Sequence, residues 1–414
     1  MTIRNVWLIN QYTSTPKLGG GGNRSYFIAK ELVRNGHNVT LITSSYSHVP
    51  KRNYKIDNHF HFEKEENINL VVIKNVVYES GKSVLRILSM LIFWLKLYFL
   101  PLKKITTPDI IIVSSISLLP ILNAFRIKSI YKNKPKVILE IRDIWPLSLV
   151  ALGGFSKYNP FLIFLSWIEK RAYIESDYIT SVLPLANEHI YSITRSNVSF
   201  KHISNGIHLE SIQLEEPLSS EIKDLLPADK FLIGYTGALG IANAMDNFID
   251  LAVSNRNDPN FYFVIVGDGY LKDSLKMKAI GLDNILFLDR IPKAQVQSIL
   301  KTFDLLYIAW HHSDIYKYGI SANKIFDYMY SAKPILMVGN IKNTEIDIAN
   351  CGKVIYSSDL IEVNKALKEF FNMSLDERKR YGNRGKDFIV KYKTYEYLTQ
   401  LYLEIFEEFE NNIK

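Results

Sequence analysis

The chain has 414 residues, 47% of them hydrophobic and 22% charged, and a formal net charge of +8 at pH 7. This composition is globular, and the length suits two domains better than one core. A single cysteine, Cys351, excludes a disulfide framework and a cysteine-rich metal site and is typical of a reducing compartment. The basic charge favours an anionic substrate or membrane over nucleic acid, because no recognisable nucleic-acid module accompanies it.

The first half of the chain alternates strand-like and helix-like patterns. Its N-terminal segment, MTIRNVWLINQY, runs directly into a strand and lacks the features of a signal peptide, so we expect a cytoplasmic protein. Strands are predicted at residues 5–10, 38–43, 70–74, 109–114 and 136–141, with helices at 24–35 and 82–104. This rhythm is typical of βαβ units and predicts a parallel sheet.

A run of glycines, Gly19 to Gly22, separates the first strand from the first helix. Gly20 and Gly21 allow the backbone to approach a ligand closely, and the N-terminus of the following helix favours an anion. A flexible surface turn is the alternative interpretation.

The segment 82–104, KSVLRILSMLIFWLKLYFLPLKK, is apolar around most of its circumference and carries five basic residues and no acid. The uncharged run between Arg86 and Lys96 is too short to span a bilayer, and Pro101 would end the helix. We expect either an interfacial helix on an anionic membrane surface or a helix packed inside the first domain. The apolar stretch 158–168 would extend such a surface.

Three charged residues, Glu140, Arg142 and Asp143, gather at the end of the strand 136–141 in the segment EIRDIWP. Ligands of doubly wound sheets bind at the carboxyl ends of strands. We therefore predict that Arg142 holds a phosphate and that Asp143 orients a hydroxyl or acts as a base. A structural ion pair is the alternative.

The pattern restarts near residue 204 and continues with strands at 231–235, 261–267, 285–288, 305–309 and 334–338. A glycine loop begins at Gly237. We expect an α/β protein of two doubly wound, Rossmann-like domains, at 1–204 and 205–390, which face a central cleft; a helix in 391–414 returns to the first domain. The histidines lack the spacing and acidic neighbours of a zinc site, so no metal is expected.

The segment 318–336, YGISANKIFDYMYSAKPIL, combines a loop, a helix N-terminus and a carboxylate, which suits a nucleotide sugar. Backbone N–H groups around Ser321 and Asn323 can face an anion, and Lys324 lies where a cation meets a diphosphate. Asp327, one turn further, can accept hydrogen bonds from ribose hydroxyls. A purely structural amphipathic helix is the alternative.

The segments GGGGNRSYFIAKELVRNGHNVTLIT, SNGIH, FLIGYTGAL, VIVGDGYLKDSL and GISANKIFDYMYSAKPIL together resemble the GT-B glycosyltransferases of family 4. EIRDIWP resembles the branch that builds bacterial O-antigen and capsule. The resemblance implies retaining transfer of an N-acetylated hexosamine or deoxyhexosamine from a nucleotide diphosphate sugar, UDP-linked, without an obligatory cofactor or metal. It also implies a polyprenyl-diphosphate-linked saccharide as acceptor and a peripheral position on the inner face of the plasma membrane.

The resemblance also assigns residues. Asp327 corresponds to the second glutamate of the family's E-x7-E motif, which holds the donor ribose, whereas Gly319 stands in place of the first glutamate. The loop 240–244 lacks the family's diphosphate-binding base, which leaves Arg290, Lys293 and Lys324 as candidates. Arg142 and Asp143 correspond to a histidine–aspartate pair and are the predicted catalytic residues.

Two other functions remain open on the sequence. One is a GT-B epimerase that acts on a UDP-sugar without an acceptor. The other is a non-catalytic sugar-nucleotide-binding scaffold on the membrane, which the missing first glutamate favours.

Overall fold

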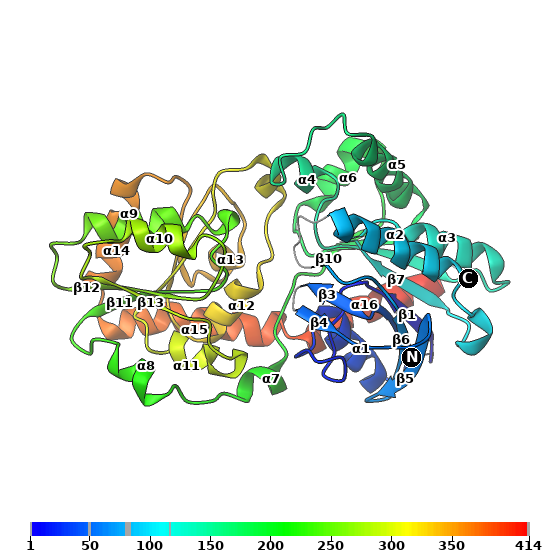
Figure 1. Cartoon of the computed structure of the whole chain (residues 1–414), viewed down its shortest axis with the longest axis horizontal. Helices are drawn as coiled ribbons and strands as arrows, with labels where there is room; N and C mark the ends of the chain where they lie inside the picture. The colour runs from blue at the N-terminus through cyan, green and yellow to red at the C-terminus, as the bar shows by residue number, and fades with distance from the viewer. Residues whose placement is uncertain (1, 49–50, 79–83, 116, 412–414) are drawn as a thin grey trace. The chain divides into compact units, whose positions relative to one another are not determined.

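The computed structural model describes residues 2–48, 51–78, 84–115 and 117–411, which form two α/β units (Figure 1). Unit 1 comprises residues 1–204 and 395–414, and unit 2 comprises residues 205–394. The last helix, α16 (Tyr395–Asn411), therefore belongs to unit 1 although it follows unit 2 in the chain.

Unit 1 contains a sheet with the strand order β10-β9-β8-β7-β1-β2-β6-β5. Neighbouring strands are parallel, as predicted, except the edge strand β5, which pairs antiparallel with β6. A separate hairpin, β3 with β4, follows β2. The strands are β1 (Asn5–Ile9), β2 (Asn38–Ser44), β3 (Tyr46–His48), β4 (Lys51–Asn53), β5 (Phe60–Glu65), β6 (Ile68–Ile73), β7 (Ile110–Ser114), β8 (Lys136–Ile141), β9 (Tyr178–Ser181) and β10 (Phe200–His202).

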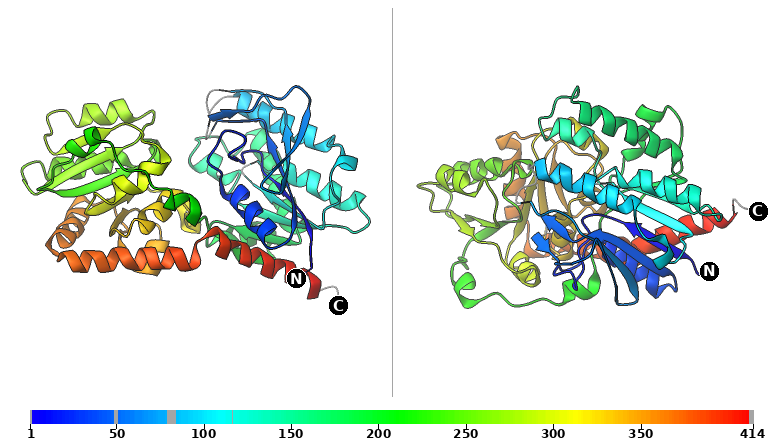
Figure 2. Two further views of the ribbon diagram at one scale, coloured as in Figure 1. Left: turned by 90° about the horizontal axis from the view of Figure 1, so that it is seen from below. Right: turned by 45° about the vertical axis from the view of Figure 1, so that its right-hand side comes forward.

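Helices cover both faces of this sheet, as the two sides of strand β1 show. Val6 and Leu8 pack in one core with residues of α1 and α16, which lie side by side (Figure 2). Trp7 and Ile9, also buried, point to the opposite face because side chains alternate along a strand. The remaining elements of unit 1 are α1 (Arg24–Arg34), α2 (Val84–Tyr98), η1 (Leu102–Lys104), α3 (Pro120–Ile130), α4 (Leu147–Ala151), α5 (Pro160–Glu175) and α6 (Ala186–Thr194).

Unit 2 has a fully parallel sheet with the order β13-β12-β11-β14-β15-β16. Its strands are β11 (Phe231–Thr236), β12 (Phe261–Val266), β13 (Ile285–Leu288), β14 (Leu305–Ala309), β15 (Ile335–Val338) and β16 (Gly352–Ile355). Its helices are α7 (Leu209–Gln213), α8 (Ser220–Asp224), η2 (Ile241–Asn243), α9 (Met245–Ser254), α10 (Lys272–Lys278), η3 (Lys293–Gln295), α11 (Val296–Leu300), η4 (Asp314–Tyr318), α12 (Asn323–Tyr330), α13 (Glu345–Ala349), α14 (Leu360–Asn372) and α15 (Leu375–Tyr392).

Each sheet reverses its strand order once, between β1 and β7 in unit 1 and between β11 and β14 in unit 2. The carboxyl ends of strands at such a reversal are the usual ligand site of doubly wound sheets. The topology therefore indicates one candidate ligand site in each unit.

Helix α2 packs one face against the core of unit 1 and exposes the opposite face. Met90, Phe93 and Leu97 on its inner face are at most 2% exposed, whereas Leu95 and Phe99 are 48% and 71% exposed. Lys82 and Ser83, part of the predicted segment, lie outside the described residues. No helix in the described ranges is long and apolar enough to cross a membrane.

Candidate active site

The candidate donor site lies in unit 2 at the carboxyl end of β11, beside the strand-order reversal. There the chain turns at Gly237, and α12 packs against the end of the strand. The buried Tyr328 of α12 accepts a hydrogen bond from the backbone N–H of Thr236 at 2.7 Å and donates one to its carbonyl. This double contact holds α12 against the end of β11, beside the glycine loop.

Lys324 places its ammonium group on this loop. Its Nζ atom lies 2.8 Å from the hydroxyl of Tyr235, donates to Oδ1 of Asn243, and sits 4.6 Å from the centre of the Tyr235 ring. It would be 3.3 Å from a Cβ atom added at Gly237. These partners are uncharged, and burial lowers the pKa of Lys324 to about 7. Such an ammonium group is well placed to meet a diphosphate.

Asp327 lies one turn further along α12 and pairs with Lys293. The Nζ atom of Lys293 is 2.7 and 2.6 Å from the two carboxylate oxygens. The aspartate side chain is only 16% exposed, whereas that of Lys293 is 74% exposed. Because an exposed ion pair contributes little and a carboxylate has about four acceptor sites, the pair leaves Asp327 able to accept ribose hydroxyls.

The loop before α12 contains Gly319, which stands at the position of the first glutamate of the expected E-x7-E motif. Gly319 has a φ of +88°, a conformation that favours glycine and would strain a glutamate at this position. Ser321 is engaged by Asn205, whose backbone N–H and side-chain amide donate to the Ser321 hydroxyl and carbonyl at 2.9 and 2.6 Å. Asn323 and Arg290 are exposed.

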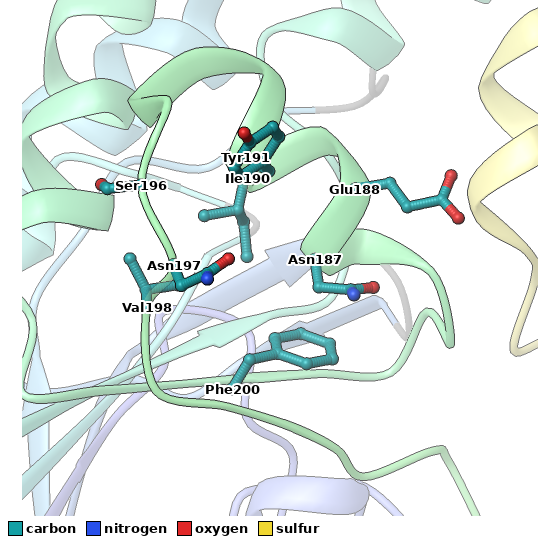
Figure 3. A pocket seen from close by; sticks show the side chains of 8 residues that line it. All are labelled: Asn187, Glu188, Ile190, Tyr191, Ser196, Asn197, Val198 and Phe200. Carbon is teal, nitrogen blue, oxygen red and sulfur yellow. The ribbon is translucent and has the colours of Figure 1, made fainter.

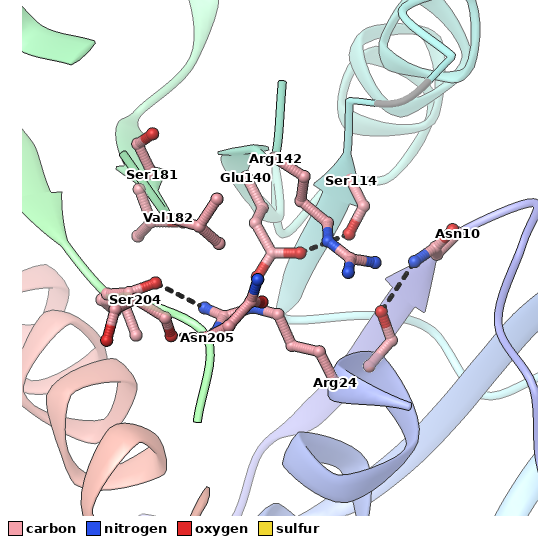
Figure 4. A network of polar contacts seen from close by, with 12 residues as sticks. Asn10, Arg24, Ser114, Glu140, Arg142, Ser181, Val182, Ser204 and Asn205 are labelled. Atoms are coloured by element: carbon pink, nitrogen blue, oxygen red, sulfur yellow. Dashed lines mark hydrogen bonds and ion pairs between the residues drawn. The ribbon is translucent and has the colours of Figure 1, made fainter. Parts of the chain in front are cut away.

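In unit 1, a buried ion pair occupies the carboxyl end of β8. Nε of Arg24 donates to Glu140 at 2.8 Å, and the other guanidinium nitrogens bond the carbonyls of Ser204 and Ile203 (Figure 4). The hydroxyl of Tyr402 in α16 donates to the same carboxylate at 2.6 Å. The side chains of Arg24 and Glu140 therefore hold one another in a buried structural pair.

The electrostatics of Glu140 follow from this pairing. Burial opposes its ionisation, but the charges of Arg24 and Arg142 and the hydrogen bonds of Ser114 and Tyr402 outweigh burial and lower its pKa to about 2. Glu140 is therefore ionised at neutral pH and unsuited to proton transfer there.

Arg142 and Asp143 follow β8. Burial lowers the pKa of Arg142, and its buried Nε atom has no hydrogen-bond partner. Burial raises the pKa of Asp143, although Ser148 donates a hydrogen bond to its carboxylate at 2.9 Å. An arginine with a spare donor and a carboxyl group with a raised pKa have the properties of functional groups.

The remaining predicted residues are less informative. The backbone N–H of Gly20 is taken up by the carbonyl of Thr15 at 3.0 Å, and Gly21 is exposed. A pocket of about 510 Å³ lies beside α6 and is lined by none of the predicted site residues (Figure 3). Across the described ranges, no three His, Cys, Asp or Glu side chains gather as a metal site.

Sequence reasoning missed Tyr235 and Asn243, which hold Lys324. The only signal for Tyr235 was its position at the end of a strand before a glycine loop. Asn243 lies 81 residues before Lys324, and no local pattern links the two.

Comparison with known proteins agrees with this architecture. Residues 18–211 match the model of Glycosyltransferase Family 4. A trehalose-6-phosphate protein from E. coli bound with UDP-2-fluoro glucose matches with a TM-score of 0.72 at 12% identity, over 97% of this chain and 98% of that one. An α,α-trehalose 6-phosphate synthase from Burkholderia multivorans matches with a TM-score of 0.73 at 11% identity, over 100% of both chains.

A third solved structure, Anabaena HepE in complex with UDP and glucose, has a TM-score of 0.64 at 12% identity, over 98% of this chain and 100% of that one. A search of the curated proteins found no match. At these identities the structural likenesses show the fold alone.

The protein is a glycosyltransferase with the GT-B fold. It carries a Glycosyltransferase Family 4 domain over residues 18–211, which confirms the family predicted from its motifs.

Proposed function

We propose that the protein transfers an N-acetylated hexosamine or deoxyhexosamine, with retention, from a UDP-sugar to a polyprenyl-diphosphate-linked saccharide during synthesis of O-antigen or capsule. The observation that carries the donor half is the placement of two charged groups on α12. The partly buried ammonium of Lys324 and the carboxylate of Asp327 lie one helical turn apart at the strand-order reversal of unit 2. This spacing suits a diphosphate followed by a ribose.

In this proposal each residue acts on a separate part of the reaction. Lys324 neutralises charge that develops on the leaving diphosphate when its bond to the anomeric carbon breaks. Asp327 holds the ribose, and Arg142 holds an anionic group of the substrate. Asp143, whose raised pKa brings it closer to neutrality, orients the acceptor hydroxyl, which bonds to the anomeric carbon and passes its proton to the departing diphosphate.

The acceptor half is supported by the outer surface of unit 1. Along α2 and its end, Leu85, Leu88, Leu95 and Phe99 are 42 to 71% exposed at helical spacing, and Ile92 lies between them. Helix α5 adds the exposed Phe164 and Trp167, whose rings stack with centres 6.1 Å apart. Exposed apolar stripes flanked by lysines are typical of helices in the membrane interface.

The donor and acceptor are tested by incubating the protein with a panel of UDP-sugars and a lipid-linked acceptor extract. We expect UDP release that depends on the extract and on one UDP-hexosamine. Release without acceptor together with an altered sugar nucleotide would instead identify an epimerase, and no release with any donor would contradict the proposed reaction.

Membrane attachment is tested separately by cosedimentation with vesicles that contain anionic lipid. The double variant Leu88→Gln and Leu95→Gln should remain in the supernatant while the wild type pellets. Ile280→Gln, a polar change at an exposed apolar position in unit 2, should pellet as the wild type does. Equal pelleting of wild type and double variant would show that the α2 stripe does not contact lipid.

A further inference from the structure

Unit 1 contains a second buried arginine, Arg52 of β4, which contrasts with Arg24. Both residues are at most 4% exposed. Arg24 faces a carboxylate and two carbonyls, whereas Arg52 takes part in no ion pair of the described residues. Only its Nη2 atom is bonded, to Thr43 Oγ1 at 3.2 Å and to the Ser44 carbonyl at 2.7 Å. Its Nε and Nη1 atoms are buried without partners.

An unpaired cation in this position is costly. Taking a charged group out of water without a counter-ion costs several kcal/mol, about the whole stability margin of many domains. Burial alone lowers the pKa of Arg52 to about 10, so the group remains charged at neutral pH. Buried charged groups with perturbed pKa values cluster at functional sites.

Other polar atoms without partners lie on the neighbouring segment. In the loop after β1, Gln11 Oε1, Thr13 Oγ1 and Ser14 Oγ are buried and unbonded. The Thr43 hydroxyl connects the two groups, because it accepts from Arg52 and lies 3.2 Å from the carbonyls of Gln11 and Thr13. Buried orphan polar atoms are rare in native proteins, and several in one place indicate a missing partner.

The topology points to the same place. Strand β1 borders the strand-order reversal of the unit 1 sheet, and β2 is its other neighbour. The orphan atoms follow β1, and Arg52 bonds the last residue of β2, so both lie at the carboxyl edge where doubly wound sheets bind ligands. The hairpin of β3 and β4 carries Arg52 to this edge.

We propose that Arg52, together with the hydroxyls of Thr13 and Ser14, binds a phosphate group of the acceptor substrate at the carboxyl edge of the unit 1 sheet. The guanidinium supplies the charge and two unused donor nitrogens, and the hydroxyls can turn to donate to further oxygens. The identity of the ligand as acceptor rests on the proposed function, in which the acceptor carries a diphosphate.

The test measures binding of inorganic pyrophosphate by calorimetry to the full-length protein saturated with UDP, so that the donor site is already filled. We expect Arg52→Met to weaken pyrophosphate at least tenfold and to leave UDP affinity unchanged. Arg195→Met, which removes the same charge from an exposed position in the same unit, should bind pyrophosphate as the wild type does.

Thermal unfolding without ligand separates a binding residue from a structural one. Removing an unpaired buried cation should leave the melting temperature of Arg52→Met equal to or above that of the wild type. A marked loss of stability, or unchanged pyrophosphate affinity, would overturn the proposal. The transferase assay with the lipid-linked acceptor extract separates this proposal from the proposed function. If that assay shows no transfer but pyrophosphate binding still requires Arg52, the phosphate site stands and the acceptor is a different phosphorylated molecule.

Discussion

Lys324 is partly buried and its hydrogen-bond partners are uncharged, so its protonation should be linked to donor binding. Its pKa falls from the ordinary 10.5 to about 7. This difference corresponds to about 5 kcal/mol in favour of the neutral amine. The groups that face it are Tyr235 of β11 and Asn243 of η2, and Asp327 on the same helix is paired with Lys293. A bound diphosphate would supply the missing negative charge and raise the pKa of Lys324 again.

The sign of the pH dependence follows from this. In the free protein at pH 8, about a tenth of Lys324 is protonated, so donor binding should take up about 0.9 proton; at pH 6 uptake should fall to about 0.1. Affinity should therefore decrease above pH 7, by up to about tenfold per pH unit. In the ligand-free protein the unfolded chain binds more protons between pH 7 and 10.5, so stability should rise with pH across that window.

Proton uptake is measured by titrating UDP-N-acetylglucosamine calorimetrically at pH 8 in two buffers of different ionisation enthalpy. A sugar-linked diphosphate has no group that titrates near neutral pH, so the difference in heat reports the protein. Lys324→Met should abolish the difference and weaken binding, whereas Lys317→Met, an exposed lysine of the same unit, should change neither. Equal heats in both buffers for the wild type, or unchanged affinity in Lys324→Met, would refute the reasoning.

Three further changes test other parts of the structure. Asp327→Ala should weaken UDP by about 10- to 100-fold through loss of charge-assisted hydrogen bonds to ribose, while Lys293→Ala should not; equal calorimetric affinity of Asp327→Ala and wild type would remove the ribose assignment. Glu140→Gln should lower the free energy of unfolding in urea by about 3 to 5 kcal/mol, because Arg24 loses its buried partner. The wild-type contribution of Glu140, whose folded pKa is about 2, should be present above pH 4.5 and be lost as the pH falls towards 2. Gly319→Glu should lower the melting temperature, since a positive φ costs a non-glycine residue about 1 to 2 kcal/mol; an unchanged value would show that this backbone tolerates the acid.

Local sequence patterns predict much of the fold. The segments 136–141, 285–288 and 305–309 were predicted as strands and are β8, β13 and β14 with the same bounds. Long apolar runs between polar turns are strong signals because they depend only on neighbours in sequence. The hairpin of β3 and β4 was missed, since three-residue strands are too short to show an alternation.

Some features of the candidate site were likewise predictable from local sequence, and others were not. The order of motifs determined the family and placed Asp327 and Lys324 one turn apart on a helix, because both depend on local spacing. Only the tertiary structure decided which charges are paired. Glu140 forms an ion pair with Arg24, 116 residues away in the sequence, and Asp327 forms one with Lys293. Lys324 and Arg52 have uncharged hydrogen-bond partners. The physical reason is that desolvation and pairing of a charge are set by whatever the fold brings into contact with it, which the residues beside it in sequence do not reveal.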